Sequence, residues 1–320
     1  MKKTNIILSF FALLILFTSC ATSIPTRIQR PAELDVSYAE TISILPFAQK
    51  PGFWDYMFFG KETYDLANYF TKQLETNLIA ANYFTIIDTK EALAALNMGR
   101  MPPSDIFITG KIYNVYSKIK EKEVKTSKDS EETHIEYYRV LNYSVLYQIV
   151  DTKTRQILDE FDQSYSEESE LFLTEKEVSS IEELAQKELS SLAVSIRKKV
   201  TPYTEKKYIN LLKDKTKNPQ MKYANELVKK EKYTNAYNEF LEVYETTKLF
   251  EAGYNAAMLL VVLEKYDDAK ILMNELYTET GSQKARNALK DIQYEIKSRE
   301  KYLQQQQSRE KALNQASENP

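Results

Sequence analysis

The chain has 320 residues, with 43 Lys and Arg against 46 Asp and Glu, a formal net charge of −3, and only one His and one Cys. The chain therefore lacks the excess of positive charge that is typical of nucleic-acid-binding proteins, and a single Cys excludes an internal disulfide. One His and one Cys also leave almost no ligands for a zinc or haem site, and no pair of the six glycines has the spacing of a phosphate-binding loop.

The first twenty residues predict a targeting signal. Two lysines precede an apolar run over 6–17, which is too short, at ~1.5 Å per residue, to cross a hydrocarbon core of ~30 Å. A basic start before a short apolar run is typical of a secretory signal peptide. Small residues then precede Cys20, the only Cys, as in a bacterial lipobox. We therefore expect 1–20 to be a lipoprotein signal peptide and Cys20 to carry the lipid; the alternative is an ordinary signal peptide that contains a Cys.

The expected location follows from the anchor. Two or three acyl chains hold a protein at a membrane surface, because one chain alone binds marginally. Residue Ala21 is not Asp, the residue that resembles an inner-membrane retention signal in enteric bacteria, so the outer membrane is favoured. We expect a palmitate-bearing lipoprotein of the bacterial cell envelope that faces the periplasm. Residues 21–36 are polar and contain two prolines, which predicts a tether.

The segment 37–201 alternates between strand and helix patterns. The strand-like segments share β-branched or alternating apolar residues; they are 41–47, 83–87, 106–116, 137–150 and 156–163. The helix-like segments share apolar residues at a spacing of three and four; they are 62–80, 90–97 and 174–200. Strands joined by helices, with a terminal hairpin, predict an α/β domain with a mixed sheet and packed helices.

An aromatic loop is expected over 51–60, between the first strand and its helix. It contains the only Trp of the chain and two of the six glycines. Trp and Tyr favour interfaces, so its aromatic residues are the candidate partner-binding residues; they are Phe53, Trp54, Tyr56, Phe58 and Phe59. The alternative is that this loop folds back over the sheet and completes the core.

Four short pieces of this segment, in their order, resemble the CsgG/LpoB superfamily of bacterial envelope lipoproteins. The pieces are Ile44-Leu45-Pro46-Phe47, Tyr83-Phe84-Thr85-Ile86-Ile87-Asp88, Asp105-Ile106-Phe107-Ile108-Thr109-Gly110 and Val150-Asp151-Thr152-Lys153-Thr154. The resemblance covers about 38–200 and implies a protein without enzymatic activity, since the family includes curli-secretion pores and activators of peptidoglycan synthases. Three of the pieces also have a structural explanation: Pro46 ends a strand, Gly110 permits a close approach, and Asp151 favours a turn.

A pore of the curli type makes a further demand on the sequence. Such a subunit inserts two hairpins into the membrane, and each strand needs ~9–11 residues with an apolar outer face. The first possible insertion, 117–136, has charged residues at both odd and even positions, so neither face of a strand would be apolar. The second, 164–180, is rich in Glu and Ser. A subunit of an oligomeric outer-membrane secretion channel of curli-assembly type therefore remains the alternative function.

Beyond Pro202 the pattern becomes helical and repeats. The segment 231–236 (EKYTNA) recurs as 264–269 (EKYDDA), an offset of 33 residues, against the ~34-residue period of tetratricopeptide repeats. Tyr and a small Ala at the start of the second helix suit a closely packed helix pair. The region resembles two such repeats, about 217–250 and 251–283.

The resemblance to tetratricopeptide repeats implies a groove for peptides or partner proteins, and the alternative is a helical spacer. Two repeats fall short of the usual three, which suggests that the helix over 284–302 acts as a cap. We expect an all-α, tetratricopeptide-like domain over 202–302 and a polar, frayed tail over 303–320.

Few residues suggest catalysis. His134 lies inside the charged insertion with no Cys or second His to join it, and Asp105 and Asp151 complete the best acid–base set available. We expect no enzyme, metal, cofactor or small-molecule substrate. The leading hypothesis is a non-catalytic, lipid-anchored protein that docks partner proteins of the envelope in the periplasm, for assembly or regulation.

Overall fold

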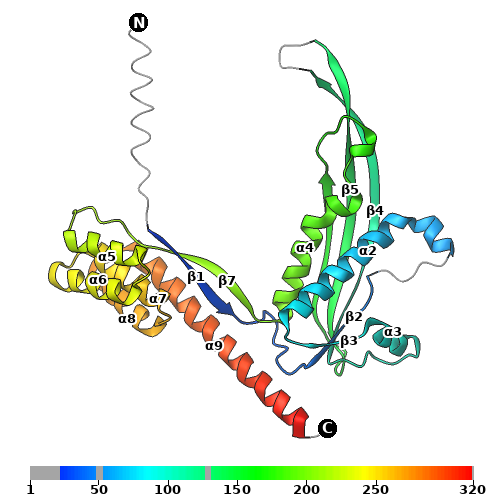
Figure 1. The fold of residues 1–320 in the computed structure, drawn as a ribbon. Coiled ribbons are helices and arrows are strands. Elements are labelled where there is room, and N and C mark those ends of the chain that lie inside the picture. The colour runs from blue at the N-terminus through cyan, green and yellow to red at the C-terminus, as the bar shows by residue number, and fades with distance from the viewer. Residues whose placement is uncertain (1–21, 48–52, 127–130, 319–320) are drawn as a thin grey trace. The chain divides into compact units, whose positions relative to one another are not determined.

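The computed structural model describes residues 22–47, 53–126 and 131–318, without the side chains of 53–62 and 316–318. Contacts within the chain divide it into two compact units. Unit 1 contains the described residues up to Pro31 together with Tyr203–Leu303, and unit 2 contains Ala32–Pro202 together with the residues from Gln304 onward. Within the described residues the fold is mixed α/β, with a five-stranded sheet, a two-stranded sheet and eight α-helices (Figure 1).

Unit 2 is built on the five-stranded sheet, in the order β3-β2-β4-β5-β6. The short strand β2 (Thr41–Ile44) is parallel to β3 (Thr85–Ile87) and to the start of β4 (Ile106–Lys125). The strands β4, β5 (Thr133–Asp151) and β6 (Ile157–Glu168) then form an antiparallel meander. The sheet is therefore mixed, as the sequence predicts.

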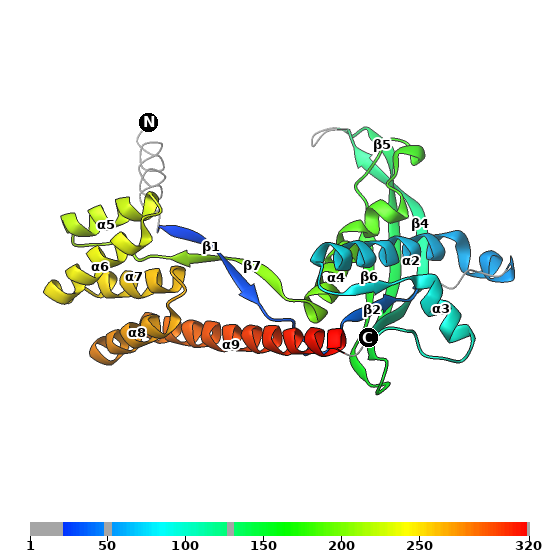
Figure 2. The ribbon, with the colours of Figure 1, turned by 60° about the horizontal axis from the view of Figure 1, so that its bottom comes forward.

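Helices α2 (Phe53–Ala81) and α4 (Ile181–Val200) pack on one face of this sheet (Figure 2). The buried residues of β5 recur at every second position on this face, because successive side chains of a strand point to opposite sides; they are Leu141, Tyr143, Val145, Tyr147 and Ile149. Helix α3 (Thr89–Asn97) buries Ala92 against Phe107 and Val150 on the other face. Unit 2 is thus two-layered, with α3 covering one corner of the second face.

Two local predictions in unit 2, at Gly110 and Asp151, are confirmed, and a third local feature fixes the start of α3. The Asp88 side chain accepts a hydrogen bond from the backbone N–H of Lys90 at 2.8 Å and caps α3. A Cβ atom at Gly110 would lie 2.2 Å from the backbone oxygen of Leu146, so the strands can approach here only because the residue is Gly. Asp151 accepts a 2.6 Å hydrogen bond from the N–H of Thr154 and holds the turn before β6.

The strands predicted over 106–116 and 137–150 are longer than expected, because β4 and β5 continue into the charged segment 117–136, with Lys122 opposite Glu136 and Ile119 opposite Arg139. Backbone hydrogen bonds and cross-strand side-chain pairs can hold two strands together, so a hairpin needs an apolar face only where another element packs on it. Helix α4 also starts later than the helix predicted over 174–200. Its start at Ile181 is set by a capping box between Ser180 and Glu183.

Unit 1 combines a two-stranded ribbon with consecutive helices. Strand β1 (Ser23–Arg30) is antiparallel to β7 (Tyr203–Asn210). The first four helices that follow pack each against the next; they are α5 (Pro219–Lys229), α6 (Tyr233–Thr247), α7 (Phe250–Val262) and α8 (Tyr266–Thr280). Helix α9 (Gln283–Glu318), of which the residues up to Leu303 belong to unit 1, adds Ala285, Ala288 and Ile292 to the same core. Their shared core is centred on Phe240, Ala256, Ala257 and Met273.

The 33-residue repetition of the sequence appears in the backbone of unit 1. Glu231 and Glu264 precede α6 and α8 with the same positive φ of 57°. The two helices end alike: Thr247 Oγ1 donates to the carbonyl of Val243 at 2.6 Å, and Thr280 Oγ1 donates to the carbonyl of Leu276 at 2.6 Å. The second helices of the two pairs, α6 and α8, therefore begin and end in the same way, 33 residues apart.

Two predictions for unit 1 are corrected by its two-stranded ribbon. Half of the tether predicted over 21–36 forms strand β1, and the helical domain predicted over 202–302 begins with strand β7. Both strands of a two-stranded ribbon are edges, so Pro25 fits there without disturbing a ladder on its other side. Charged residues lie on both faces of β7, so its sequence lacks the alternation of apolar and polar residues from which a strand is predicted.

The tail predicted over 303–320 is also wrong, since α9 continues to Glu318. In unit 2 it is held by two buried side chains. Gln305 accepts from the N–H of Ala32 at 2.8 Å and donates to the Ala32 carbonyl at 3.0 Å. Arg309 donates to the carbonyls of Ala39 and Tyr83, with its guanidinium 4.3 Å from the centre of the Tyr83 ring.

Candidate functional site

Two of the predicted sites lie wholly or partly outside the described residues. Cys20, the predicted lipid-attachment residue, is one of them, as is the signal peptide over 1–20. The predicted aromatic loop is wrong as a loop, because α2 begins at Phe53 and includes the backbone of all five aromatic residues. Their side chains are outside the described part of the chain, so their role as contact or core stays a prediction; they are Phe53, Trp54, Tyr56, Phe58 and Phe59.

The two aspartates of the possible acid–base set hold the backbone of unit 2. Asp105 Oδ2 accepts from the N–H groups of Glu40 and Thr41 at 2.8 and 2.9 Å, which ties β2 to the start of β4. Asp151 accepts from the hydroxyl groups of Tyr38 and Thr154. Burial raises the pKa of Asp151, but these hydrogen bonds outweigh it and hold this pKa below its usual value. One carboxylate oxygen of Asp105 and both of Asp151 are thus engaged within the fold.

His134 lies at the far part of the β4–β5 hairpin. Its Nε2 atom is 2.8 Å from Glu136 Oε1, two residues along the same strand. The register places it opposite Val124, whereas Asp105 and Asp151 lie at the other end of the two strands. The three residues therefore do not meet in one site.

Unit 1 has a surface groove along α9, which we call the α9 groove. It consists of two adjoining hollows of about 470 and 100 Å³ that share Glu264, Tyr266, Arg299 and Leu303. Apolar and charged side chains line it together; the further lining residues are Ile28, Gln29, Lys265, Asp267, Asp268, Glu295, Ile296, Glu300 and Tyr302. Leu303 is 47% exposed in it, although its side chain is apolar.

Arg299 organises the middle of the α9 groove. Its Nη1 atom donates to the backbone oxygen of Glu264 at 3.3 Å and to the Oε2 atom of the same residue at 3.1 Å. Its guanidinium lies 5.5 Å from the centre of the Tyr266 ring. Burial raises the pKa of Tyr266, and the nearby carboxylates of Glu264 and Glu295 raise it further. The phenol therefore remains protonated and can donate or accept a hydrogen bond in the groove.

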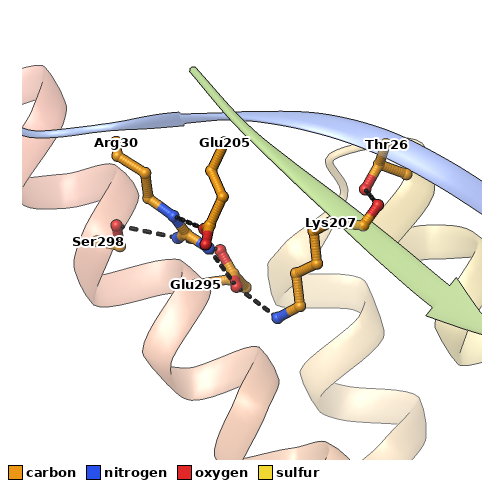
Figure 3. Close-up of polar contacts among 6 residues, drawn as sticks. All are labelled: Thr26, Arg30, Glu205, Lys207, Glu295 and Ser298. Atoms are coloured by element: carbon orange, nitrogen blue, oxygen red, sulfur yellow. Dashed lines mark hydrogen bonds and ion pairs between the residues drawn. The ribbon is translucent and has the colours of Figure 1, made fainter. Parts of the chain in front are cut away.

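Glu295, which lines the smaller hollow of the α9 groove, belongs to a buried ion cluster (Figure 3). Glu295, only 2% exposed, accepts from Arg30 Nη1 at 2.6 Å, from Arg30 Nη2 at 3.0 Å and from Lys207 Nζ at 2.8 Å. Glu205 Oε2 accepts from Arg30 Nε at 2.6 Å. Arg30 also reaches the hydroxyl of Ser298 at 3.2 Å. The cluster joins β1, β7 and α9 with two cations and two carboxylates.

The charges of the ion cluster stabilise one another. Burial alone raises the pKa of Glu295, but the hydrogen bonds from Arg30 and Lys207 reverse this and lower it below the usual value. Burial likewise lowers the pKa of Arg30, and its bonds to Glu295 and Glu205 overcome that effect and raise it. Both groups are therefore ionised in the folded chain, and neither is free to exchange a proton near neutral pH.

Sequence reasoning misses both the α9 groove and its ion cluster. Arg30 and Glu295 are separated by 265 residues and lie within segments that read as a tether and a capping helix. No local spacing connects them. The one available signal is an Arg at the end of a segment with alternating Ile24, Thr26 and Ile28, which in hindsight is a strand pattern.

A second hollow of unit 1, the lysine hollow, lies where the described chain begins. It has a volume of about 640 Å³. Its lining combines Thr22 with the loop after β7 and with α5; the other lining residues are Leu212, Lys213, Asp214, Lys217, Asn218, Lys222, Asn225, Glu226 and Lys229. Four lysines thus face two carboxylates in this hollow.

Two searches of the described part of the chain are negative. None of the helices there is long and apolar enough to cross a membrane. Within the same residues, no three His, Cys, Asp or Glu side chains come together in a way that would hold a metal ion.

No protein-family profile and no curated protein matches the sequence. Solved structures show weak likeness. The PelC dodecamer from Paraburkholderia phytofirmans has a TM-score of 0.26 at 10% identity, over 56% of this chain and 98% of that one. A minor lipoprotein from Acinetobacter baumannii has a TM-score of 0.26 at 13% identity, over 50% and 91%. The hypothetical protein CT253 from Chlamydia trachomatis has a TM-score of 0.27 at 10% identity, over 50% and 96%. At these scores the likeness carries no functional argument.

Proposed function

We propose that this chain is a non-catalytic, lipid-anchored protein of the bacterial cell envelope that docks partner proteins through the α9 groove. The observation that carries the proposal is the composition of this groove. Ile296 and the half-exposed Leu303 offer apolar contact, and Arg299 with Glu264 and Glu300 surrounds them with charge of both signs. Apolar anchors within a charged rim are typical of protein interfaces.

The two helix pairs of unit 1 support this proposal. Their 33-residue period and their matching ends are what a tetratricopeptide-like unit would have, and such units expose grooves to peptides. The buried ion cluster joins β1, β7 and α9 through Glu295, which also lines the smaller hollow, so it fixes part of the groove wall. A groove that is formed before binding spends less of its binding energy on ordering side chains.

The anchor and location are supported by the sequence. The apolar run before Cys20 and the short pieces in CsgG/LpoB-like order favour a lipoprotein that faces the periplasm. Anchoring raises the local concentration of a partner at the membrane, so recognition alone can have a functional effect. The partner would be a protein of the same compartment.

The α9 groove can be tested with a photo-crosslinking amino acid in place of Leu303, in intact cells. Ile271 on α8 is the matched control, since it is also aliphatic and 59% exposed but lines neither hollow of the groove. We expect one defined protein adduct from position 303 and none from position 271. The variant Leu303→Asp should abolish that same adduct when the crosslinker is moved to position 300. Equal labelling from both positions would contradict the groove as a docking site.

The anchor has a separate test. Metabolic labelling with palmitate should mark the wild-type chain and not Cys20→Ser. Absence of label from the wild type would overturn the anchor and leave the groove result standing. A detergent-resistant ring of the full chain with measurable conductance would instead favour the secretion-channel alternative.

A further inference from the structure

The described chain begins directly on the surface of unit 1. The backbone oxygen of Thr22 accepts a 2.8 Å hydrogen bond from the N–H of Leu211, and strand β1 starts at the next residue. Only two peptide steps separate Thr22 from Cys20. Two residues span at most ~7 Å, so a lipid on Cys20 would bring the membrane surface to the immediate surroundings of Thr22. With β1 in place of a tether, little slack remains between lipid and protein.

The surroundings of Thr22 are the lysine hollow, and much of its positive charge is uncompensated. Of its two carboxylates, Glu226 is paired with Lys229 at 3.0 Å. Asp214 accepts from the backbone N–H groups of Thr216 and Asn218 within its own loop. The remaining lysines make no ion pair within the described residues; they are Lys213, Lys217 and Lys222, and all three are exposed.

We propose that the lysine hollow rests on the membrane and binds the phosphate groups of anionic phospholipids; this inference rests on the proposed anchor at Cys20. The reach of ~7 Å is shorter than the Debye length of ~8 Å at physiological ionic strength, so salt screens the attraction only in part. Lysines near an anionic bilayer attract it electrostatically. They also supply the second contact that stabilises a lipid anchor.

Charge and reach together favour a membrane over a protein partner at this surface. A partner protein can approach any exposed face, whereas the bilayer must lie within two residues of Thr22 once Cys20 is acylated. The segment 211–230 carries six Lys against two acidic residues, a net charge of +4 that is complementary to an anionic bilayer. Tyr223, adjacent to Lys222 and 54% exposed, adds a residue that favours the membrane interface.

The test uses the full lipidated chain in vesicles of phosphatidylcholine alone and in vesicles with 30 mol% phosphatidylglycerol (roughly the anionic content needed for surface attraction). Lysines are acetylated with a water-soluble reagent and their rates are read by mass spectrometry. We expect Lys213, Lys217 and Lys222 to react roughly fivefold more slowly in the anionic vesicles, with the protection weakening as salt rises. Lys284 and Lys297, exposed on α9 in unit 1, should react at equal rates in both.

A charge-reversal variant isolates the cause. In K213E/K217E/K222E, the exposed neighbour Lys215 serves as the reporter, and its protection in anionic vesicles should disappear. The matched variant K284E/K290E/K297E changes the net charge equally at exposed positions of the same unit and should keep that protection.

The outcomes separate the two proposals. Palmitate on Cys20 with equal lysine rates in both vesicles overturns this inference alone. Absence of palmitate overturns the anchor and this inference together. Protection in intact cells but not in anionic vesicles means that a protein covers the lysine hollow, which also overturns it.

Discussion

The two halves of α9 are held by buried polar side chains of different chemistry. In unit 1, Glu295 binds the two cations Arg30 and Lys207. In unit 2, Gln305 and Arg309 bind backbone groups of the segment that leads into β2, and Arg309 also binds the carbonyl of Tyr83. The first arrangement depends on the ionisation of a carboxylate, and the second depends on backbone groups that are always present. The same helix thus responds to mutation and to pH differently in the two units.

The energies of the two arrangements should differ as well. Removing one partner of a buried ion pair leaves an uncompensated charge, which costs about 3–5 kcal/mol. Leaving a buried carbonyl without a donor costs less, about 1–3 kcal/mol. Unit 1 should therefore be more sensitive to a single change in α9 than unit 2.

The largest effect is expected for Glu295→Gln. The neutral amide would leave the buried guanidinium of Arg30 without its main carboxylate, so we expect a loss of about 3–5 kcal/mol in the free energy of unfolding of unit 1. Urea denaturation followed by hydrogen exchange of the β1 and β7 amides measures this. Glu300→Gln, at an exposed position of the same helix, should change it by less than about 0.5 kcal/mol. Equal effects of the two substitutions would show that the ion cluster does not stabilise unit 1.

The second prediction compares the stability lost on replacing one glycine by alanine in each unit. In Gly110→Ala the new Cβ would lie 2.2 Å from a backbone oxygen that cannot move without its strand, so we expect a loss of roughly 3 kcal/mol in unit 2. In Gly253→Ala the nearest atoms, from 2.8 Å, belong to the Tyr244 ring, and the gain in helix propensity of up to ~1 kcal/mol offsets part of the clash. Thermal unfolding of both variants gives the order, and a larger loss for Gly253→Ala would reverse it.

A smaller effect is expected for Arg309→Met, which keeps the length of the side chain and removes its donors. The carbonyls of Ala39 and Tyr83 would lose this partner, and we expect a loss of about 2 kcal/mol in unit 2. The exposed Lys311→Met on the same helix is the control. Hydrogen exchange of the β2 and β3 amides reports the change. If the control lowers their protection equally, the contacts of Arg309 are not the cause.

The smallest effect is a difference in acid sensitivity. Hydrogen bonds from Arg30 and Lys207 outweigh burial and lower the pKa of Glu295 in the folded chain. Its contribution is therefore complete above the unfolded value of about 4.3 and is lost as pH falls from there through the lower folded pKa. We expect β1 and β7 amides to lose protection in this window in the wild type and to lose less in Glu295→Gln. The hydrogen-exchange protection of the Ala32 amide, which is bonded to Gln305, should stay constant over the same pH range. A parallel loss of protection at Ala32 would contradict the difference in pH dependence between the two units.

Predictions based on neighbouring residues hold in both units. The turn at Asp151 and the cap of α3 by Asp88 each depend on a few consecutive residues. The close approach at Gly110 follows from the residue type alone, although the atom that comes close belongs to Leu146 on the next strand. The 33-residue repetition also survives in the structure, because it records two similar helix pairs that each form locally. The strands of the β4–β5 hairpin run further than predicted because their outer parts pack against little, and an apolar pattern appears only where a face is buried.

The candidate site behaves differently, because it depends on pairs of residues that are far apart in the chain. From the sequence alone came the α/β segment followed by helices, which the structure confirms, whereas the signal peptide that ends at Cys20 stays a prediction. Only the tertiary structure decided that Arg30 meets Glu295, that β1 replaces a tether, and that the end of α9 is held at Gln305 and Arg309. The physical reason is that propensity and periodicity act over a few turns, whereas a buried charge is tolerated only beside a partner that folding brings to it.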